Sequence, residues 1–451
     1  MASPHQIKPR VQDKTDLARF RLTVEVRSTP AAPRNYVPRP KPSSPSHLRR
    51  RWGWLSKLGL ALAVLLFAAA TFNFLRPIPE VVAATSVPVQ STIPGTPPSL
   101  PWPGVGSAAV GASDLGLIGT SGDAAPAPTA SVAKVMTALV LLTDKPLKKG
   151  EAGPILTITD QDVATYLADL ADQQSVVRVR AGEQLSQFAA LEALLIPSGN
   201  NIAETLARWD AGSVAAFVSK MNQRAAALHL TRTTFADPAG ASIQTVSTAT
   251  DLLALGMAAM QQEVIAQIVN LSQTTLPVVG TMYNVNAALG QSGIVGIKTG
   301  SGLNSGANFL FAAAATIDSS PVTLYGCVMG LPTLDAAFKA AEALIKTMQA
   351  AVTVRQVTTR NGVVGAYQTA WGSRSDLVAT SDATLVEWPG MILRQRLDAQ
   401  TIVVDRPTVA GMSAGKLHIV LGDQQLDVPL VIAGSLDPPG TSWRLFRINL
   451  F

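Results

Sequence analysis

The chain has 451 residues, 47% of them hydrophobic and 15% charged, and its formal net charge is +6. This length allows two or three domains with large apolar cores. The positive charge is confined to the N-terminus: residues 1–57 contain thirteen Lys/Arg and three Asp/Glu and carry +10, which leaves about −4 for the rest. The sequence therefore predicts no basic surface with interleaved aromatic residues, and no nucleic-acid partner.

The N-terminal region combines a basic tail with an apolar segment. Residues 1–51 lack apolar periodicity and are rich in Pro and Arg, which predicts a disordered tail. Residues 52–76 are predicted to form a transmembrane anchor, because the eighteen residues of Leu58–Leu75 are uncharged and reach the lower limit of a membrane-spanning helix. A cleaved signal peptide with a cut near Ala68–Ala70 is the alternative, but the long tail before it favours an uncleaved anchor.

Basic residues set the expected orientation of this anchor. Arg49–Arg51 and Lys57 lie on its N-terminal side, which is therefore predicted to be cytoplasmic. The chain is then a single-pass protein of the cell membrane with its main part extracytoplasmic. Residues 77–104 contain eight prolines and predict an extended linker that holds the folded part away from the membrane.

The remaining sequence has two regions of different pattern. Residues 105–352 show short strands, then helices, then apolar strands and a closing helix, which predicts an α+β fold with an antiparallel sheet and a helical cluster. Residues 353–451 show short alternating segments, such as Thr401–Val404 and Leu417–Leu421, and predict a small β-rich domain.

One helix of the first region carries an unusual charge. Ala130–Leu142 is predicted to be buried on nearly all sides, and Lys134 is its only charged residue, three positions after Ser131. This spacing puts the amine and the hydroxyl on one face. A buried ammonium tends to lose its proton, and a neutral lysine beside a serine is a base beside a nucleophile. The alternative is a surface helix whose lysine reaches solvent.

The same S-x-x-K spacing occurs a second time, in Ser413–Lys416. Gly415 and the strand-like residues after it predict no helix there, so this pair is an internal control. Two other short motifs lie between the pairs: Ser198-Gly199-Asn200 in a tight loop between helices, and Lys298-Thr299-Gly300 on a strand. Alone, each would be an ordinary turn or strand end.

Together the motifs stand in the order S-x-x-K, S-x-N and K-T-G, the set found in penicillin-binding proteins and class A β-lactamases. Over about residues 105–350 the sequence resembles the low-molecular-weight penicillin-binding proteins that are serine-type D-Ala-D-Ala carboxypeptidases. The similarity includes Leu194–Asn200, Phe235–Gly240 and Gly296–Gly300. It implies the penicillin-binding, β-lactamase-like transpeptidase fold, followed by a smaller β domain.

The resemblance implies a catalytic role for four residues. Ser131 would attack the D-Ala-D-Ala carbonyl of a peptidoglycan stem pentapeptide and form an acyl-enzyme, with Lys134 as its base. Ser198 would pass the proton to the leaving D-Ala, and Asn200 would orient Lys134 and bind the substrate backbone. β-Lactams are the implied covalent inhibitors.

Four further residues are implied in substrate binding. Lys298 and Thr299 would hold the terminal carboxylate, and Gly300 would let the strand approach closely. The backbone N–H groups of Ser131 and Ser301 would form the oxyanion hole. The sequence departs from the family at Asn201, where Asp is common, and at Ser301, where a bulky residue is usual.

Three other functions remain to be weighed. A D,D-endopeptidase acting on peptidoglycan cross-links uses the same residues with a longer leaving group. A class A-like β-lactamase needs a deacylating Glu, and the only glutamates between the second and third motifs, Glu204 and Glu263, lie on predicted helices. A non-catalytic wall-binding protein is disfavoured because all three motifs are intact.

Cysteine and histidine chemistry is not expected. Cys327 is the single cysteine and lies in an apolar strand, where a core position is the better interpretation. His5, His47, His229 and His418 are scattered, and no pair has metal-ligand spacing. The sequence therefore predicts neither a metal site nor a Ser-His-Asp triad, and the serine chemistry needs no cofactor.

Overall fold

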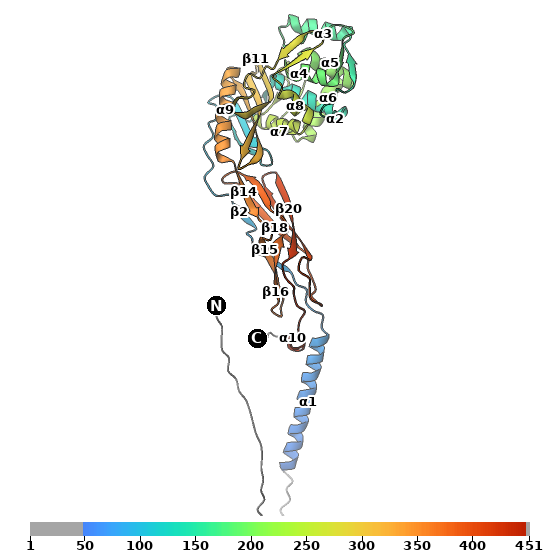
Figure 1. Cartoon of the computed structure of the whole chain (residues 1–451), viewed down its shortest axis with the longest axis vertical. Coiled ribbons are helices and arrows are strands. Elements are labelled where there is room, and N and C mark those ends of the chain that lie inside the picture. Colours follow the sequence, from blue (N-terminus) through green and yellow to red (C-terminus); the bar gives the residue numbers. More distant parts are fainter. Residues whose placement is uncertain (1–47, 448–451) are drawn as a thin grey trace, which may run out of the picture. The chain divides into compact units, whose positions relative to one another are not determined.

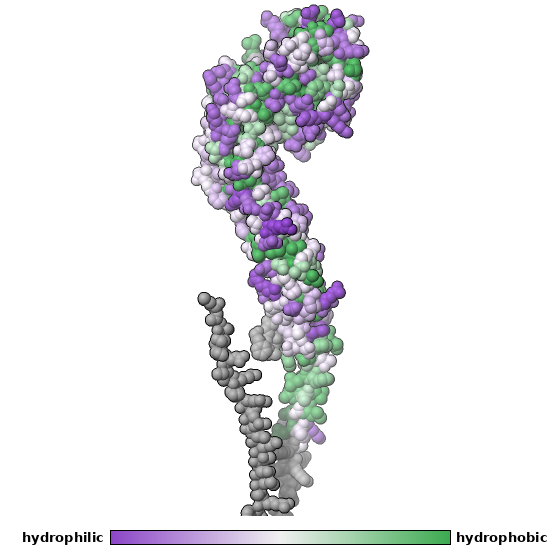
Figure 2. All heavy atoms as spheres, viewed as in Figure 1, coloured by the Kyte–Doolittle hydropathy of each residue, from purple (hydrophilic) through white to green (hydrophobic). Residues whose placement is uncertain are grey.

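The computed structural model describes residues 48–447, and the chain divides into two units, Met1–Ala69 and Ala70–Phe451. The predicted basic tail up to residue 47 lies outside the described residues. Helix α1, Leu48–Leu75, starts four residues before the predicted anchor and contains the apolar stretch Gly53–Leu75, long enough to cross a membrane. Figure 2 shows the apolar surface of this helix, none of whose hydrophobic window is buried.

The sheet that supports the site has five antiparallel strands in the order β11-β12-β13-β3-β4 (Figure 1). Its strands are β3 (Ser107–Ala112), β4 (Gly116–Ser121), β11 (Ile294–Gly302), β12 (Gly306–Ile317) and β13 (Ser320–Leu331). The N-terminal hairpin therefore pairs with strands some two hundred residues later in the chain. This arrangement is the predicted α+β fold with an antiparallel sheet.

Helices cover both faces of this sheet because the strand side chains alternate in direction. Leu310 and Ala312 of β12 join the core of the helical cluster, whereas Phe309 and Phe311 face helix α9. Cys327 of β13 is fully buried in the cluster core, as predicted. The helices are α2 (Lys134–Asp144), α3 (Asp160–Ala171), α4 (Gln187–Leu195), α5 (Asn200–Ala211), α6 (Val214–Ala227), α7 (Ala249–Met260), α8 (Glu263–Val269) and, on the other face, α9 (Leu334–Ala351).

Short two-stranded ladders tie the loops of the helical cluster together. Thr248 caps helix α7 by accepting a hydrogen bond from the Asp251 N–H at 3.1 Å. The ladders pair β5 (Ala127–Pro128) with β8 (Val246–Ser247), β6 (Ile155–Thr157) with β7 (Gln184–Ser186), and β9 (Gln273–Leu276) with β10 (Gly280–Tyr283).

A second, β-rich region follows helix α9. Its main sheet has the order β1-β15-β16-β20-β19-β18-β2, and β14 pairs separately with β17. The strands are β1 (Ala83–Thr85), β2 (Gln90–Thr92), β14 (Thr353–Thr358), β15 (Val363–Gln368), β16 (Arg374–Ala379), β17 (Ala383–Glu387), β18 (Ile392–Ala399), β19 (Ser413–Leu421) and β20 (Gln424–Ile432).

Two expectations for this region are corrected. Residues 77–104 are not a free spacer, because β1 and β2 form the two edges of the seven-stranded sheet and Val81 and Ile93 are buried in its core. Thr401–Val404 is not a strand of the sheet. Within it only Ile402 pairs, through hydrogen bonds with the backbone of Val81.

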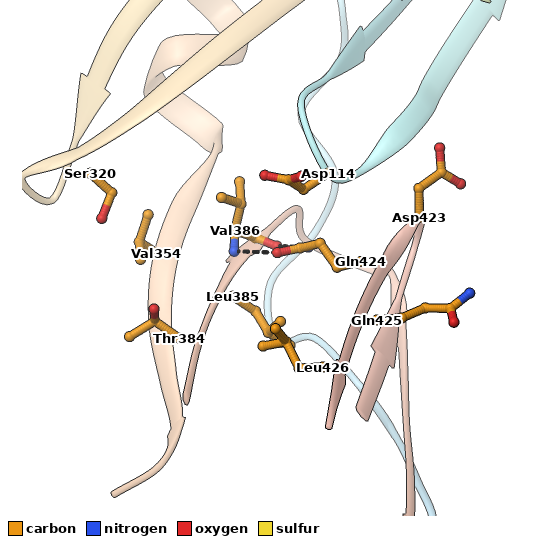
Figure 3. A pocket seen from close by; sticks show the side chains of 10 residues that line it. All are labelled: Asp114, Ser320, Val354, Thr384, Leu385, Val386, Asp423, Gln424, Gln425 and Leu426. Atoms are coloured by element: carbon orange, nitrogen blue, oxygen red, sulfur yellow. Dashed lines mark hydrogen bonds between the residues drawn. The ribbon is translucent and has the colours of Figure 1, made fainter. Parts of the chain in front are cut away.

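The β-rich region meets the first sheet beside the turn between β3 and β4 (Figure 3). A cavity of about 510 Å³ lies there, next to Asp114 and Asp423. The Gln424 carboxamide closes one wall by accepting a hydrogen bond from the Val386 N–H at 2.9 Å and donating to the Val386 carbonyl at 2.7 Å. No serine–lysine pair lines this cavity, and the described residues contain no cluster of metal-ligating side chains there.

The C-terminal helix α10, Thr441–Phe446, contacts the chain where helix α1 ends. Arg447 donates hydrogen bonds to the carbonyls of Asn73, at 2.9 Å, and Arg76, at 2.7 Å. Arg444 donates to the Phe74 carbonyl and its guanidinium lies 4.4 Å from the Phe74 ring centroid. These bonds satisfy carbonyls that the end of an α-helix leaves without a partner.

Candidate active site

The site is built around a short 3₁₀ turn, Ala130–Ala133, that leads directly into helix α2. The predicted helix from Ala130 is therefore in two parts, with Ser131 in the turn and Lys134 as the first residue of α2. Two glycines let other segments approach this turn. A Cβ at Gly240 would lie 1.8 Å from the Ala130 carbonyl oxygen, and one at Gly300 would lie 3.0 Å from the Ser131 nitrogen.

Lys134 is fully buried and contacts three oxygen atoms. Its Nζ lies 2.7 Å from Ser131 Oγ, 2.6 Å from Asn200 Oδ1 and 2.9 Å from the Ala239 carbonyl oxygen. The structure thus brings the predicted nucleophile, its base and the asparagine of the second motif to one point.

The environment favours the neutral form of this lysine. Burial is the largest cause that lowers the pKa of Lys134 well below its ordinary 10.5, and the positive charge of Lys298 lowers it further. Asp237 and Asp169 act in the opposite direction. The amine is therefore predisposed to carry a free lone pair close to the Ser131 hydroxyl.

The second motif joins the end of α4 to the start of α5. Ser198 has φ of 69° and is buried, and its Oγ has no hydrogen-bond partner among the described residues. A buried hydroxyl without a hydrogen-bond partner costs free energy of folding. A bound substrate could supply the missing partner, which fits a group that exchanges protons with that substrate. Asn200 is the first residue of α5 and places its side chain between Lys134 and Gln174.

The third motif lies on β11, which pairs with β12 at the edge of the sheet. Lys298 is fully buried, and burial lowers its pKa from 10.5 to about 7. Its Nζ donates a hydrogen bond to the Thr299 carbonyl at 3.0 Å. Thr299 is buried beside it, and Ser301 is exposed at the cavity described next.

A cavity of about 440 Å³ opens over these motifs. Ser131 and Asn200 of the first two motifs line it, together with Ser301, which directly follows the third motif. Ser198, Lys298 and Thr299 are buried and do not line it. Its rim includes the exposed side chains of Ile243 and Leu303, the latter at the hairpin between β11 and β12. The bulky side chain in this part of the cavity is therefore that of Leu303, two residues after Ser301.

The loop around Asp237 supplies one of the Lys134 contacts, through the Ala239 carbonyl, and this contact was not predicted from the sequence. Asp237 Oδ2 accepts hydrogen bonds from the N–H groups of Ala239 and Ala241, and Oδ1 accepts one from the Thr245 hydroxyl. This Asx-type turn holds the Ala239 carbonyl against Lys134. The local signal was the Asp-Pro-Ala-Gly sequence, which indicates a turn but not its partner.

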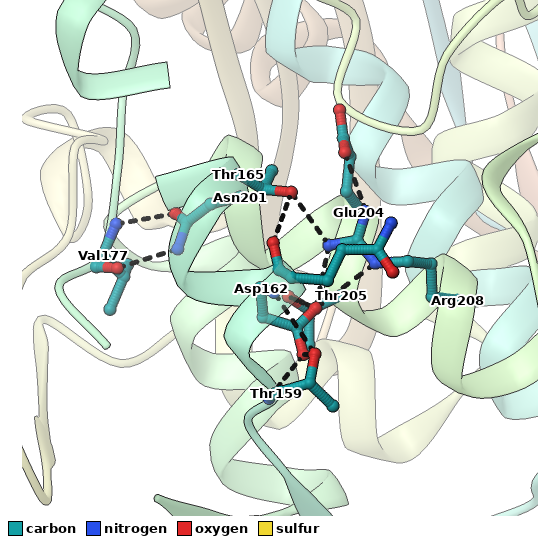
Figure 4. Close-up of polar contacts among 9 residues, drawn as sticks. Thr159, Asp162, Thr165, Val177, Asn201, Glu204, Thr205 and Arg208 are labelled. Atoms are coloured by element: carbon teal, nitrogen blue, oxygen red, sulfur yellow. Dashed lines mark hydrogen bonds and ion pairs between the residues drawn. The ribbon is translucent and has the colours of Figure 1, made fainter. Parts of the chain in front are cut away.

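A polar network beside the site fixes α5 against α3 (Figure 4). The Arg208 guanidinium donates to Asp162 Oδ1 at 2.8 Å and to Glu204 Oε2 at 3.0 Å. Burial of Asp162 opposes its ionisation, but hydrogen bonds from Thr159, Arg208 and Thr205 outweigh that effect and lower its pKa below 3.8. The Asp162 carboxylate is therefore ionised at neutral pH, and its bonds to Thr205 and Arg208 anchor the helix that carries Asn200.

Asn201, where the family often has Asp, is part of the same region. It is fully buried, its Oδ1 accepts from the Val177 N–H at 2.9 Å, and its Nδ2 donates to the Val177 carbonyl at 2.8 Å (Figure 4). A carboxylate could accept the first bond but could not donate the second. The amide therefore suits this position without adding a charge near Lys134.

The part of the chain that carries this site is similar in sequence to D-alanyl-D-alanine peptidases. Residues 117–333 match the sequence model of the family described as D-alanyl-D-alanine carboxypeptidase. A D-alanyl-D-alanine endopeptidase of Pseudomonas aeruginosa is 32% identical over 203 residues, which is 44% of this chain and 62% of that protein. The D-alanyl-D-alanine carboxypeptidase DacB2 of Mycobacterium tuberculosis is 36% identical over 147 residues, 31% of this chain and 45% of that protein. The chain thus spans less than two thirds of the length of these relatives.

Solved structures agree on the fold. The Streptomyces K15 DD-transpeptidase is matched over 57% of this chain and 100% of its own, with 26% identity and a TM-score of 0.50. Penicillin binding protein 5 from Haemophilus influenzae is matched over 76% of this chain and 99% of its own, with 19% identity and a TM-score of 0.56. The second match shows likeness of fold alone, and it extends into the β-rich region.

Proposed function

We propose that this chain, whose residues 117–333 match the D-alanyl-D-alanine carboxypeptidase family model, is a serine-type low-molecular-weight penicillin-binding protein that cleaves the D-Ala-D-Ala bond of peptidoglycan stem peptides. The observation that carries the proposal is the contact set of Lys134. A neutral amine has two N–H groups and one lone pair. Asn200 Oδ1 and the Ala239 carbonyl can only accept, so they take both N–H groups and leave the lone pair for the Ser131 hydroxyl.

The proposed reaction follows from this proton inventory. Ser131 Oγ attacks the carbonyl carbon while its proton moves to Lys134 Nζ. Collapse of the tetrahedral intermediate breaks the C–N bond, and the proton passes from Lys134 through the Ser198 hydroxyl to the leaving D-Ala nitrogen. Ser198 Oγ is free for this role because it is buried and has no hydrogen-bond partner among the described residues. Water then attacks the acyl carbon while losing a proton to Lys134 Nζ, and the ester bond breaks as Lys134 returns this proton to Ser131 Oγ, which regenerates the free serine and the neutral lysine.

Substrate binding is assigned to the third motif. The terminal carboxylate of the substrate would pair with Lys298 and with the Thr299 hydroxyl. Although burial lowers the pKa of Lys298 to about 7, an incoming carboxylate favours the charged form of the lysine. The N–H groups of Ser131 and Ser301 would stabilise the oxyanion, and the close approach of Gly300 to the Ser131 nitrogen supports this geometry.

Of the two activities that cleave this bond, we assign the chain that of a carboxypeptidase, which removes one terminal D-Ala, rather than that of an endopeptidase. The test is incubation with a pentapeptide muropeptide and with a cross-linked dimer, followed by mass spectrometry. We expect the pentapeptide to lose one alanine. Cleavage of the dimer alone would assign the chain to the endopeptidases, the activity in the name of the Pseudomonas relative, and cleavage of neither substrate would overturn the proposal.

A β-lactamase is the less favoured function. Glu204 is engaged in an ion pair with Arg208, and Glu263 is the first residue of helix α8. Neither lines the cavity over Ser131. We therefore propose that penicillins acylate Ser131 and leave slowly, which a stoichiometric burst without turnover of a chromogenic cephalosporin would show and continuous turnover would contradict.

We also propose that helix α1 anchors the chain in the cell membrane as a single span, with the catalytic region outside the cytoplasm. Its apolar stretch of 23 residues is long enough for the ~30 Å hydrocarbon core. Protease added to intact spheroplasts should digest the catalytic region and leave an N-terminal tag protected. A secreted form beginning near Thr71 would show instead that the segment is a cleaved signal.

A further inference from the structure

A four-residue segment after helix α3, Gln174–Val177, runs along the start of helix α5 and is bonded to it. Gln174 Oε1 accepts a hydrogen bond from Asn200 Nδ2 at 2.5 Å. The Ser175 carbonyl accepts one from the Asn200 backbone N–H at 2.8 Å, and the Asn201 carboxamide makes both of its bonds to Val177. The residue that contacts Lys134 is thus held from its far side by this segment.

We infer that Gln174 is a positioning residue that fixes which end of the Asn200 carboxamide faces Lys134, and this inference rests on the proposed function. A carboxamide can turn over and exchange its oxygen and nitrogen, and little in the shape of the group prevents this. Gln174 presents Oε1 to Asn200, so with Gln174 in this orientation only the Asn200 orientation with Nδ2 toward Gln174 and Oδ1 toward Lys134 keeps the hydrogen bond. Gln174 is itself a carboxamide, so Asn200 can reverse without losing this bond only if both side chains turn together.

The orientation matters because it decides where the lone pair of Lys134 lies. With Oδ1 toward the amine, one N–H of neutral Lys134 is used by Asn200 and the other by the Ala239 carbonyl. In the reverse orientation an Asn200 N–H would donate to the lone pair instead. The Ser131 proton would then have no acceptor, although Lys134 would remain neutral and in place.

The position of Gln174 suits a role in orienting Asn200 better than a role in core packing. Its side chain is partly exposed at the cavity wall rather than packed in the core. Nδ2 of Asn200 has two N–H groups, so one can bond Gln174 while the other remains available to a substrate carbonyl. The role of this glutamine could not be predicted from the sequence, because nothing in Asp172–Ser175 indicates a partner 26 residues later.

The test compares two substitutions at Gln174 with one at a matched glutamine in the full-length protein. Gln174→Met keeps the size and removes the acceptor, whereas Gln174→Glu keeps an acceptor and adds a negative charge. Gln161→Met, on the exposed first turn of helix α3, is the control for the same chemical change. The readouts are the rate constant of Ser131 acylation by penicillin as a function of pH, the initial binding constant, and the midpoint of thermal unfolding.

We expect Gln174→Met to slow acylation roughly tenfold at every pH, the scale of one lost hydrogen bond, with little change in binding or unfolding midpoint. Gln174→Glu should approach the wild-type rate at high pH. Its acidic limb should move to higher pH, because the added carboxylate joins Asp237 and Asp169 in opposing the effect of Lys298 on the pKa of Lys134.

Two results would overturn the inference. One is equal acylation by Gln174→Met and Gln161→Met, and the other is a Gln174→Glu protein as slow as Gln174→Met at high pH, which would indicate a role in shape alone. Both are distinct from failure of the proposed function, since that failure would appear as a wild-type Ser131 that penicillin does not acylate.

Discussion

Two regions of this molecule contain the pattern S-x-x-K, and its serine and lysine lie in contact in one region and far apart in the other. Ser131 and Lys134 lie on consecutive helical turns, and Lys134 Nζ is 2.7 Å from the serine oxygen with none of the lysine exposed. Ser413 and Lys416 lie on strand β19, where a rise of ~3.3 Å per residue separates them by roughly 10 Å. Lys416 is 44% exposed in its side chain and pairs with Asp427 at 2.6 Å.

The difference shows that the four-residue pattern alone does not fix the environment of its lysine. Burial and Lys298 push the pKa of Lys134 down, so this lysine can act as a base. Lys416 is exposed and pairs with the Asp427 carboxylate, so it lacks the burial that disfavours the charged form of a lysine. The predictions below set the two pairs against each other.

The largest effect is expected at the serines. Ser131→Ala should abolish covalent labelling by a fluorescent penicillin, because the nucleophile is removed, while Ser413→Ala should label as the wild type does. Labelling is read on a denaturing gel after a fixed incubation. Retained labelling of Ser131→Ala would move the nucleophile elsewhere and break the comparison.

Substitution of the two lysines should affect the rate of acylation by penicillin differently. Lys134→Ala should slow acylation by ~10² to 10⁴, the usual contribution of a general base, and Lys416→Ala should leave it unchanged. The wild-type rate should fall as the pH is lowered, because Lys134 gains a proton as the pH passes through its depressed folded pKa. Stopped-flow acylation from pH 5 to 10 measures both effects, and equal rates for the two variants would remove Lys134 from the mechanism.

Much of this arrangement could be predicted from local sequence. The apolar run around Lys134, the tight turn at Ser198 and the strand at Lys298 each have a clear local pattern, and the structure forms the helix, the loop and the strand that these patterns predict. Gly415 in the second S-x-x-K pattern correctly indicated a strand.

The rest depends on contacts between distant residues, which periodicity does not encode. Ala83–Thr85 pairs with Gly365–Tyr367, and the prolines around it indicated only an extended chain. The Ala239 carbonyl reaches Lys134 because an Asx turn at Asp237 folds against another segment. In each case the local conformation was predictable and the partner was not.

The smallest effect is expected in stability, and it again separates a buried lysine from an exposed one. Burial lowers the pKa of Lys298 from 10.5 to about 7 in the folded state. Between these two values the unfolded chain binds a proton that the folded chain does not, so the free energy of unfolding falls as the pH is lowered from about 10.5 to about 7, and no further below that. The burial of Lys298 therefore destabilises the fold most at pH 7 and below.

Lys298→Met removes this cost while leaving the Thr299 carbonyl without its donor, a loss of ~1 kcal/mol. We expect the variant to be more stable than the wild type at pH 7, and the difference to shrink by pH 9.5. Lys416→Met should show no such dependence, because that lysine is exposed. Urea unfolding of the full chain in detergent at both pH values measures the gap. A Lys298→Met protein that is less stable at pH 7 than at pH 9.5, relative to the wild type, would show that this lysine is charged and well paired in the folded state, more like Lys416 than like Lys134.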